Sequence, residues 1–65
     1  MSDTVAAQTA ALTALLADRQ FNADKMNALY AQCEAMRRDL GTDARLGVAE
    51  ALRRNPPTGD TVLLN

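Results

Sequence analysis

The sequence predicts an all-α protein, and two observations lead to this fold class. Alanine occurs thirteen times and leucine nine times among the 65 residues, whereas isoleucine is absent and valine occurs three times. Alanine and leucine are strong helix formers, while β-branched residues favour strands. Apolar residues also recur at helical spacings of three and four. We therefore expect a short helical hairpin plus a third helix, a small three-helix bundle with an extended C-terminal tail.

The first helix is expected at about residues 4–18. Ser2, Asp3 or Thr4 can cap its N-terminus, where a carboxylate also suits the helix dipole. One side carries the larger apolar residues, which are Val5, Leu12, Leu15 and Leu16. The opposite side carries alanines, and no charge occurs between Asp3 and Asp18. This helix therefore lacks the charged face that a solvent-exposed helix normally presents.

The second helix, expected at about residues 23–40, has the clearest periodicity. Its apolar stripe consists of Met26, Leu29, Cys33, Met36 and Leu40. A seam of small residues on another side consists of Ala28, Ala31 and Ala35. On this pattern we expect Cys33 to be a buried core residue rather than a reactive thiol, because the chain has no histidine to activate it.

The connection between these two helices has two interpretations. An unbroken heptad spacing runs through Val5, Leu12, Arg19, Met26, Cys33 and Leu40. A single rod-like helix would follow this spacing. However, Arg19 and Asn22 would then occupy consecutive core positions, which is costly for unpaired polar groups. Asn22 is also a favoured helix cap, and Asp24 suits a first turn. We favour a turn at residues 19–22 over the rod.

The third helix is expected at about residues 43–54. Gly41 suits the end of the preceding helix, and Thr42 can cap the new one. The expected inward face consists of Ala44, Val48, Ala51 and Leu52. Leu46 projects instead among charged residues. Two prolines at positions 56 and 57 end the helix, because proline has no amide hydrogen to donate.

This reading divides the chain into a helical domain at residues 1–55 and a tail at residues 56–65. The tail ends in an apolar stretch made of Val62, Leu63 and Leu64. Such a stretch can fold back across the helices of its own chain, or it can add an extended strand to another protein. The sequence leaves both alternatives open.

Composition and motifs argue against several functional classes. The net charge is −1, with acidic and basic residues interspersed, so a nucleic-acid or anionic-membrane partner is not expected. The carboxylates Asp39, Asp43 and Glu50 are too scattered for an acid–base pair or a metal-binding loop. Asp3 stands where a secretory signal needs positive charge. We expect a cytoplasmic, non-enzymatic protein without cofactor, metal, membrane span or small-molecule substrate.

The expected function is that of a helical protein–protein interaction module, such as an assembly subunit, adaptor or small chaperone. A core of this size supplies only about 3–5 kcal/mol, so a homo-oligomer, coiled coil or larger protein partner would add stability. The expected contact residues are Ala7, Ala10, Ala11, Ala14, Leu46, Val62, Leu63 and Leu64. The alternative is a small nucleic-acid-binding regulator that uses Arg45, Arg53 and Arg54. Met26 and Met36 can also mark an adaptable groove, although core positions are the commoner reading.

Overall fold

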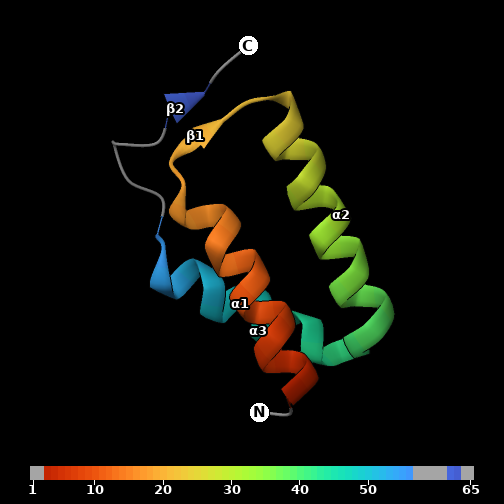
Figure 1. Cartoon of the computed structure of the whole chain (residues 1–65). Helices are drawn as coiled ribbons and strands as arrows, with labels where there is room; N and C mark the ends of the chain where they lie inside the picture. Colours follow the sequence, from red (N-terminus) through yellow and green to blue (C-terminus); the bar gives the residue numbers. More distant parts are fainter. Residues whose placement is uncertain (1–2, 57–61, 64–65) are drawn as a thin grey trace.

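The structure is a computed structural model that describes residues 3–56 and 62–63 and is built mainly from helices (Figure 1). The helices are α1 (Asp3–Ala17), α2 (Ala23–Leu40) and α3 (Ala44–Arg54). A 3-10 turn, η1 (Gly41–Asp43), joins α2 to α3, so that residues 23–54 form one bent helical segment. Two strands of two residues each are β1 (Gln20–Phe21) and β2 (Val62–Leu63). The all-α class is confirmed, and this strand pair is a small addition to it.

The chain turns between α1 and α2, so the rod interpretation is wrong. α1 ends at Ala17, and α2 begins after Asn22, whose side chain accepts a hydrogen bond from the backbone N–H of Lys25 at 2.8 Å. This is the expected helix cap. The Asp18 carboxylate accepts a bond from the Gln20 backbone N–H at 3.1 Å. The Asn22 bond satisfies an N–H group that the start of α2 would leave open, and the Asp18 bond satisfies the amide of Gln20 in the turn.

The bend between α2 and α3 begins at Gly41, as expected. Its φ angle of +59° lies in the region that favours glycine, and its N–H bonds to the carbonyl oxygen of Arg37. The predicted side-chain cap at Thr42 is wrong. The chain stays helical through η1, and the Ala44 N–H reaches the carbonyls of Gly41 and Thr42. The Ala44 amide is therefore bonded within the backbone and needs no side-chain cap.

α1 contacts both other helices and packs most extensively against α3, in front of which it lies in Figure 1. The buried apolar side chains of the described residues are Val5, Leu12, Met36 and Ala51. Around the last three of these, a ring of partly buried apolar residues consists of Leu16, Leu29, Leu40, Ala44 and Val48. The core is therefore small, and much of the apolar surface that surrounds it remains in contact with solvent.

α1 and α3 come close together at Thr9 and Gly47. A Cβ atom on Gly47 would lie 2.8 Å from Thr9 Oγ1 and 2.6 Å from Met36 Cε, so a larger residue does not fit without movement. The sequence analysis assigned no role to Gly47. A glycine inside a helix destabilises the helix by up to about 1 kcal/mol relative to alanine. A glycine at such a position therefore indicates a close contact between helices.

Three expected core positions are exposed. Met36 is buried and Leu29 is half-buried, as predicted, but Cys33 is exposed and Met26 is 41% exposed. The expectation that Cys33 is a core residue is therefore wrong. On α3, Leu52 is also 41% exposed, so its predicted inward position is wrong as well. Leu46 is 62% exposed, as expected.

Polar bonds between α1 and α2 account for the exposure of Met26 and Cys33. Lys25 Nζ donates to the Leu15 carbonyl oxygen at 2.7 Å, and Gln32 Nε2 donates to Gln8 Oε1 at 2.7 Å. Lys25 and Gln32 precede Met26 and Cys33 by one position each, which corresponds to 100° around the helix. Because Lys25 and Gln32 face α1, Met26 and Cys33 are turned away from α1.

Within the segment predicted as a tail, β2 pairs with β1 of the same chain. The two strands are parallel, with Gln20 opposite Val62 and Phe21 opposite Leu63, so that segments distant in sequence lie side by side (Figure 1). Arg19 Nη2 also donates to the Pro56 carbonyl oxygen at 3.0 Å. Of the two alternatives for the tail, the structure shows the return to the same chain at these two residues. Leu64 lies outside the described residues.

Candidate protein-binding surface

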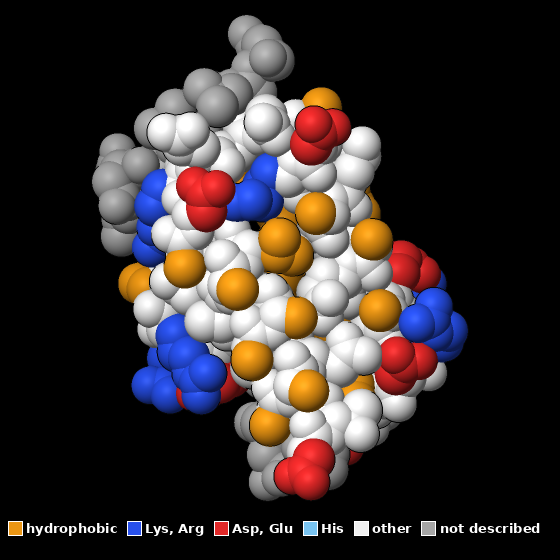
Figure 2. All heavy atoms as spheres, viewed as in Figure 1, with side chains coloured by type: hydrophobic (Ala, Val, Ile, Leu, Met, Phe, Trp, Pro, Cys, Tyr) orange, Lys and Arg blue, Asp and Glu red, His pale blue; other side chains and the backbone are white. Residues whose placement is uncertain are grey.

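The outward side of α1 is an exposed and uncharged surface. We define it as the alanine face, consisting of Ala7, Ala10, Ala11 and Ala14, all of which are exposed. The buried residues of the same helix, Val5, Thr9 and Leu12, lie on its other side. Figure 2 shows hydrophobic side chains following this helix at the molecular surface. The structure therefore brings together the four alanines that the sequence predicted as contact residues.

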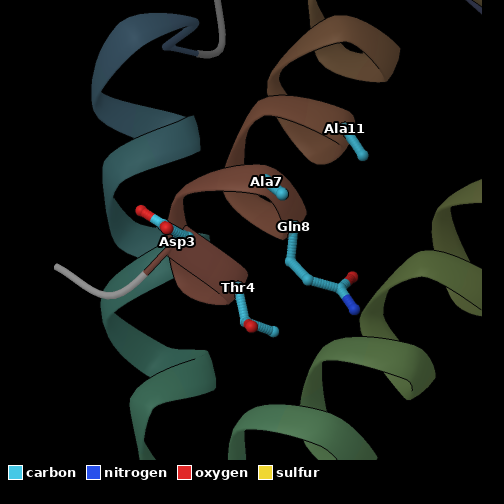
Figure 3. A pocket seen from close by; sticks show the side chains of 5 residues that line it. All are labelled: Asp3, Thr4, Ala7, Gln8 and Ala11. Atoms are coloured by element: carbon cyan, nitrogen blue, oxygen red, sulfur yellow. The ribbon is translucent and has the colours of Figure 1, made fainter.

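A shallow hollow of about 380 Å³ lies at the N-terminal part of this face. Its lining consists of Asp3, Thr4, Ala7, Gln8 and Ala11. Thr4, Gln8 and Ala11 point toward the α2 side, whereas Asp3 points to the opposite side (Figure 3). The hollow is open to solvent and lined mainly by small groups, so it is suited to receiving a small side chain of a partner.

Gln8 fixes the position of α1 against α2 beside the alanine face. Its Nε2 atom donates to Asp39 Oδ2 at 3.0 Å, while Gln32 Nε2 donates to its backbone oxygen at 3.2 Å and to its side-chain oxygen at 2.7 Å. Hydrogen bonding from the Arg38 guanidinium, with a smaller contribution from Gln8, lowers the pKa of Asp39. The lowered pKa favours the ionised carboxylate, which accepts the hydrogen bond that joins α1 to α2.

Lys25 fixes the other end of the hairpin. Its side chain is 11% exposed, and its ammonium group donates to the carbonyl oxygens of Leu15 at 2.7 Å and Asp18 at 3.0 Å. The ammonium also lies 3.5 Å from the Asp18 carboxylate and 4.9 Å from the centroid of the Phe21 ring. The Gln20 backbone N–H and then Lys25 lower the pKa of Asp18. Lys25 was not singled out by sequence analysis, although a basic residue that caps the carbonyls of a helix end is a known device.

The remaining predicted contact residues do not join the alanine face in one patch. Leu46 lies on α3 near the η1 bend, whereas Val62 and Leu63 lie beside β1 at the other end of the hairpin (Figure 1). The structure therefore places the predicted contact residues at three separate locations. Among the predicted contact residues whose exposure the structure describes, the four alanines form one group of neighbouring exposed side chains.

The arginine face of the alternative hypothesis is partly neutralised within the chain. Glu50 Oε1 accepts bonds from Arg53 Nη2 at 2.6 Å and from Arg54 Nε at 3.0 Å. These two arginines, Arg53 first, lower the pKa of Glu50. Because two guanidinium groups share one ionised carboxylate, this face presents less free positive charge than its sequence suggests.

Within residues 3–56 and 62–63, no three histidine, cysteine, aspartate or glutamate side chains are grouped in a way that could hold a metal ion. No helix in this part of the chain combines the length and apolar character needed to cross a bilayer. Comparison of the chain with protein-family models, with curated proteins and with solved structures finds no significant match. The functional argument therefore rests on the exposed surfaces of the molecule.

Proposed function

We propose that this chain is a non-enzymatic helical interaction module that associates with itself or with a larger protein, as an assembly subunit, adaptor or small chaperone does. The alanine face is the observation that carries the proposal. An exposed helix side normally bears charged residues, whereas this one bears small apolar groups. Small side chains allow a second helix to approach closely and to make a closely packed contact.

The rigidity of the hairpin supports this proposal. Gln8, within the segment that bears the alanine face, and Lys25, bonded to Leu15 just after it, both hold α1 against α2. A surface that is already fixed in its binding geometry loses less conformational entropy when a partner docks. Binding would therefore gain from preorganisation as well as from burial of apolar area.

The proposal includes the architecture of the interacting unit and its location. We assign residues 1–55 to a small three-helix bundle and residues 56–65 to a tail, supported by the contacts of α1 with both α2 and α3. A core with four buried apolar side chains among the described residues is small for an independent domain, so association would supply the missing stability. The single cysteine fits a reducing, cytoplasmic environment.

Charged substitutions on the alanine face test the proposal. Ala10→Glu and Ala11→Glu place a carboxylate in the proposed contact, where burial of an unpaired charge costs several kcal/mol. Ala49→Glu is the matched control, because Ala49 is an exposed alanine within α3. Light scattering at several concentrations, with a captured native partner added, should show loss of association for the two α1 variants only.

Circular dichroism checks that all three variants keep their helices, since glutamate is also a good helix former. A parent chain that stays monomeric, together with α1 variants that bind the captured partner as well as Ala49→Glu does, would falsify the proposed interface.

A further inference from the structure

α2 and α3 diverge from the η1 bend (Figure 1). Apolar residues near this divergence form a second exposed surface. We define the open apolar face by six residues, which are Leu16, Met26, Leu29, Cys33, Val48 and Leu52. Leu16, Leu29 and Val48 pack, partly buried, against the core. Met26, Cys33 and Leu52 are exposed. These side chains are larger than those of the alanine face and lie mainly on other helices.

Helical spacing places the α2 part of this face away from the junction with α1. Met26 and Cys33 are seven residues apart and therefore share one side of α2. Gln32 and Asp39 are also seven residues apart, and their bonds to Gln8 show that their side faces α1. Met26 and Cys33 thus continue outward from the partly buried core beneath them.

The seven-residue spacing also shows on which side of α3 each charged residue lies. Arg45 and Leu52 are seven residues apart and share a side with Val48. Asp43 and Glu50, also seven apart, lie on a different side. The apolar residues of α3 are therefore flanked by a basic residue, while the acidic residues near and within this helix point elsewhere.

Two arginines border the open apolar face close to the η1 bend. Arg37 follows Cys33 by four residues on α2, and Arg45 precedes Val48 by three on α3. Among the described residues, Arg37 pairs with Glu34 at 2.8 Å, so part of its charge is neutralised, although solvent screens this exposed pair. Within the described part of the chain, Arg45 forms no ion pair. This end of the face therefore favours a negatively charged ligand group.

We infer that the open apolar face binds an amphipathic α-helix of another protein, one with leucine-like residues on its apolar side and acidic residues at one end. An apolar surface between two helices accepts such a helix through anchors spaced by three, four and seven residues. Met26 adds an adaptable side chain to this contact. A second copy of the chain is a poorer occupant, because it would present the same arginine-bordered surface. This inference goes beyond the proposed function, since it concerns a different surface.

Cys33 provides a direct probe of this surface, because it is the only cysteine and is exposed. The ligand is a synthetic helical peptide of about four turns, with leucines at helical spacing and glutamates at one end. Its matched control carries glutamines in place of the glutamates. Saturation with the glutamate peptide should slow Cys33 alkylation by about tenfold, because a docked helix covers the thiol. The glutamine peptide should bind about tenfold more weakly, because it lacks the charges that pair with the arginines.

Four variants locate the binding face. Leu52→Lys should weaken binding of the glutamate peptide by about tenfold or more, because it places a charge in an apolar contact. Leu46→Lys is the matched control, since Leu46 is exposed on a different side of the same helix. Arg45→Glu should weaken binding of the glutamate peptide and strengthen binding of a lysine version. Ala10→Glu should leave peptide binding unchanged, which separates this test from that of the alanine face.

Several outcomes would overturn the inference. They are unprotected Cys33 at peptide saturation, equal effects of Leu52→Lys and Leu46→Lys, and equal affinities for the glutamate and glutamine peptides. Protection of Cys33 that rises with protein concentration in the absence of peptide would identify a second copy as the occupant and would overturn the assignment to another protein.

Discussion

α1 and α3 approach each other closely at Thr9 and Gly47, where the space is too small for one additional carbon atom on Gly47. The Thr9 side chain is 1% exposed, and its hydroxyl oxygen has no hydrogen-bond partner among the described residues. A buried hydroxyl without a partner costs about 1–3 kcal/mol. The absent side chain of Gly47 makes room for this oxygen and for the end of Met36. Both residues are therefore sensitive to changes of a single group.

We predict that Thr9→Val stabilises the protein by about 1 kcal/mol, because a methyl group replaces the unpartnered hydroxyl with a similar shape. For a domain of this size that gain raises the melting temperature by about 4–8 °C. Thr13→Val is the control on the same helix, since the Thr13 hydroxyl bonds to the Thr9 carbonyl at 2.7 Å. Thermal unfolding followed by circular dichroism measures both. A lower melting temperature for Thr9→Val would contradict the prediction.

Gly47→Ala should have the opposite effect. Alanine favours the helix by about 1 kcal/mol relative to glycine, but its methyl group would meet Thr9 Oγ1 at 2.8 Å and Met36 Cε at 2.6 Å. We expect overpacking to dominate and to destabilise the fold by about 1–3 kcal/mol. Urea denaturation measures this loss, and Thr9→Ala in the Gly47→Ala background should recover part of it. Unchanged or increased stability of Gly47→Ala would show that the helices can separate without cost.

At the scale of the elements, local chemistry explains what the sequence could predict. The bounds of α2, the cap at Asn22 and the positive φ at Gly41 each depend on residues within one or two turns, and all agree with expectation. The rotation of α2 was not predictable from periodicity, which counts apolar residues only. Lys25 and Gln32 take inward positions because each has bonding partners on α1, and such partners become visible only in the folded structure.

We predict that Lys25→Met destabilises the hairpin by about 1–3 kcal/mol, because it removes hydrogen bonds from a charged group to the Leu15 and Asp18 carbonyls. Methionine keeps most of the apolar part of the lysine side chain. The loss of stability therefore measures the contribution of the ammonium group. Arg37→Met is the control, because the exposed Arg37–Glu34 pair should contribute less than about 1 kcal/mol. Urea denaturation compares the two. Equal effects would show that Lys25 acts only as a surface charge.

Three carboxylates make stability depend on acid pH. The pKa of Asp18 is lowered mainly by the Gln20 backbone N–H, that of Asp39 mainly by Arg38, and that of Glu50 mainly by Arg53. A pKa lower in the folded state than in the unfolded state means that the unfolded chain binds protons first. The stabilisation is therefore complete above the ordinary values of 3.8 for aspartate and 4.5 for glutamate, and it is lost as the pH falls below them.

Urea denaturation across this pH range should therefore show falling stability on acidification. The triple variant in which Asp18→Asn, Asp39→Asn and Glu50→Gln are combined should show a weaker pH dependence, because its amides do not titrate. A parent chain whose stability rises below pH 4.5, the ordinary value for glutamate, would contradict the assigned pKa directions.

At the scale of the whole molecule, apolar surface is divided between a small core and two exposed faces. The sequence predicted the alanine face because its evidence, the lack of charge between Asp3 and Asp18, lies within one helix. The sequence did not predict the open apolar face. The spacing of Cys33 and Leu52 fits a buried stripe as well as an exposed one, and only the structure shows that both residues are exposed. The return of the tail to β1 was likewise one of two alternatives, since strand pairing over this distance has no local signal.

The small core leads to a prediction about the whole chain, which is that thermal stability rises with protein concentration if the partner is a second copy. Association stabilises only the folded state, so mass action raises the melting temperature as concentration increases. We expect a rise of several degrees over about a hundredfold range of concentration.

Ala10→Glu should remove this dependence while Ala49→Glu retains it, because only the first lies on the alanine face. Differential scanning calorimetry measures all three proteins. A melting temperature of the parent that is independent of concentration would contradict self-association, and a concentration dependence that survives Ala10→Glu would place the self-contact on another surface.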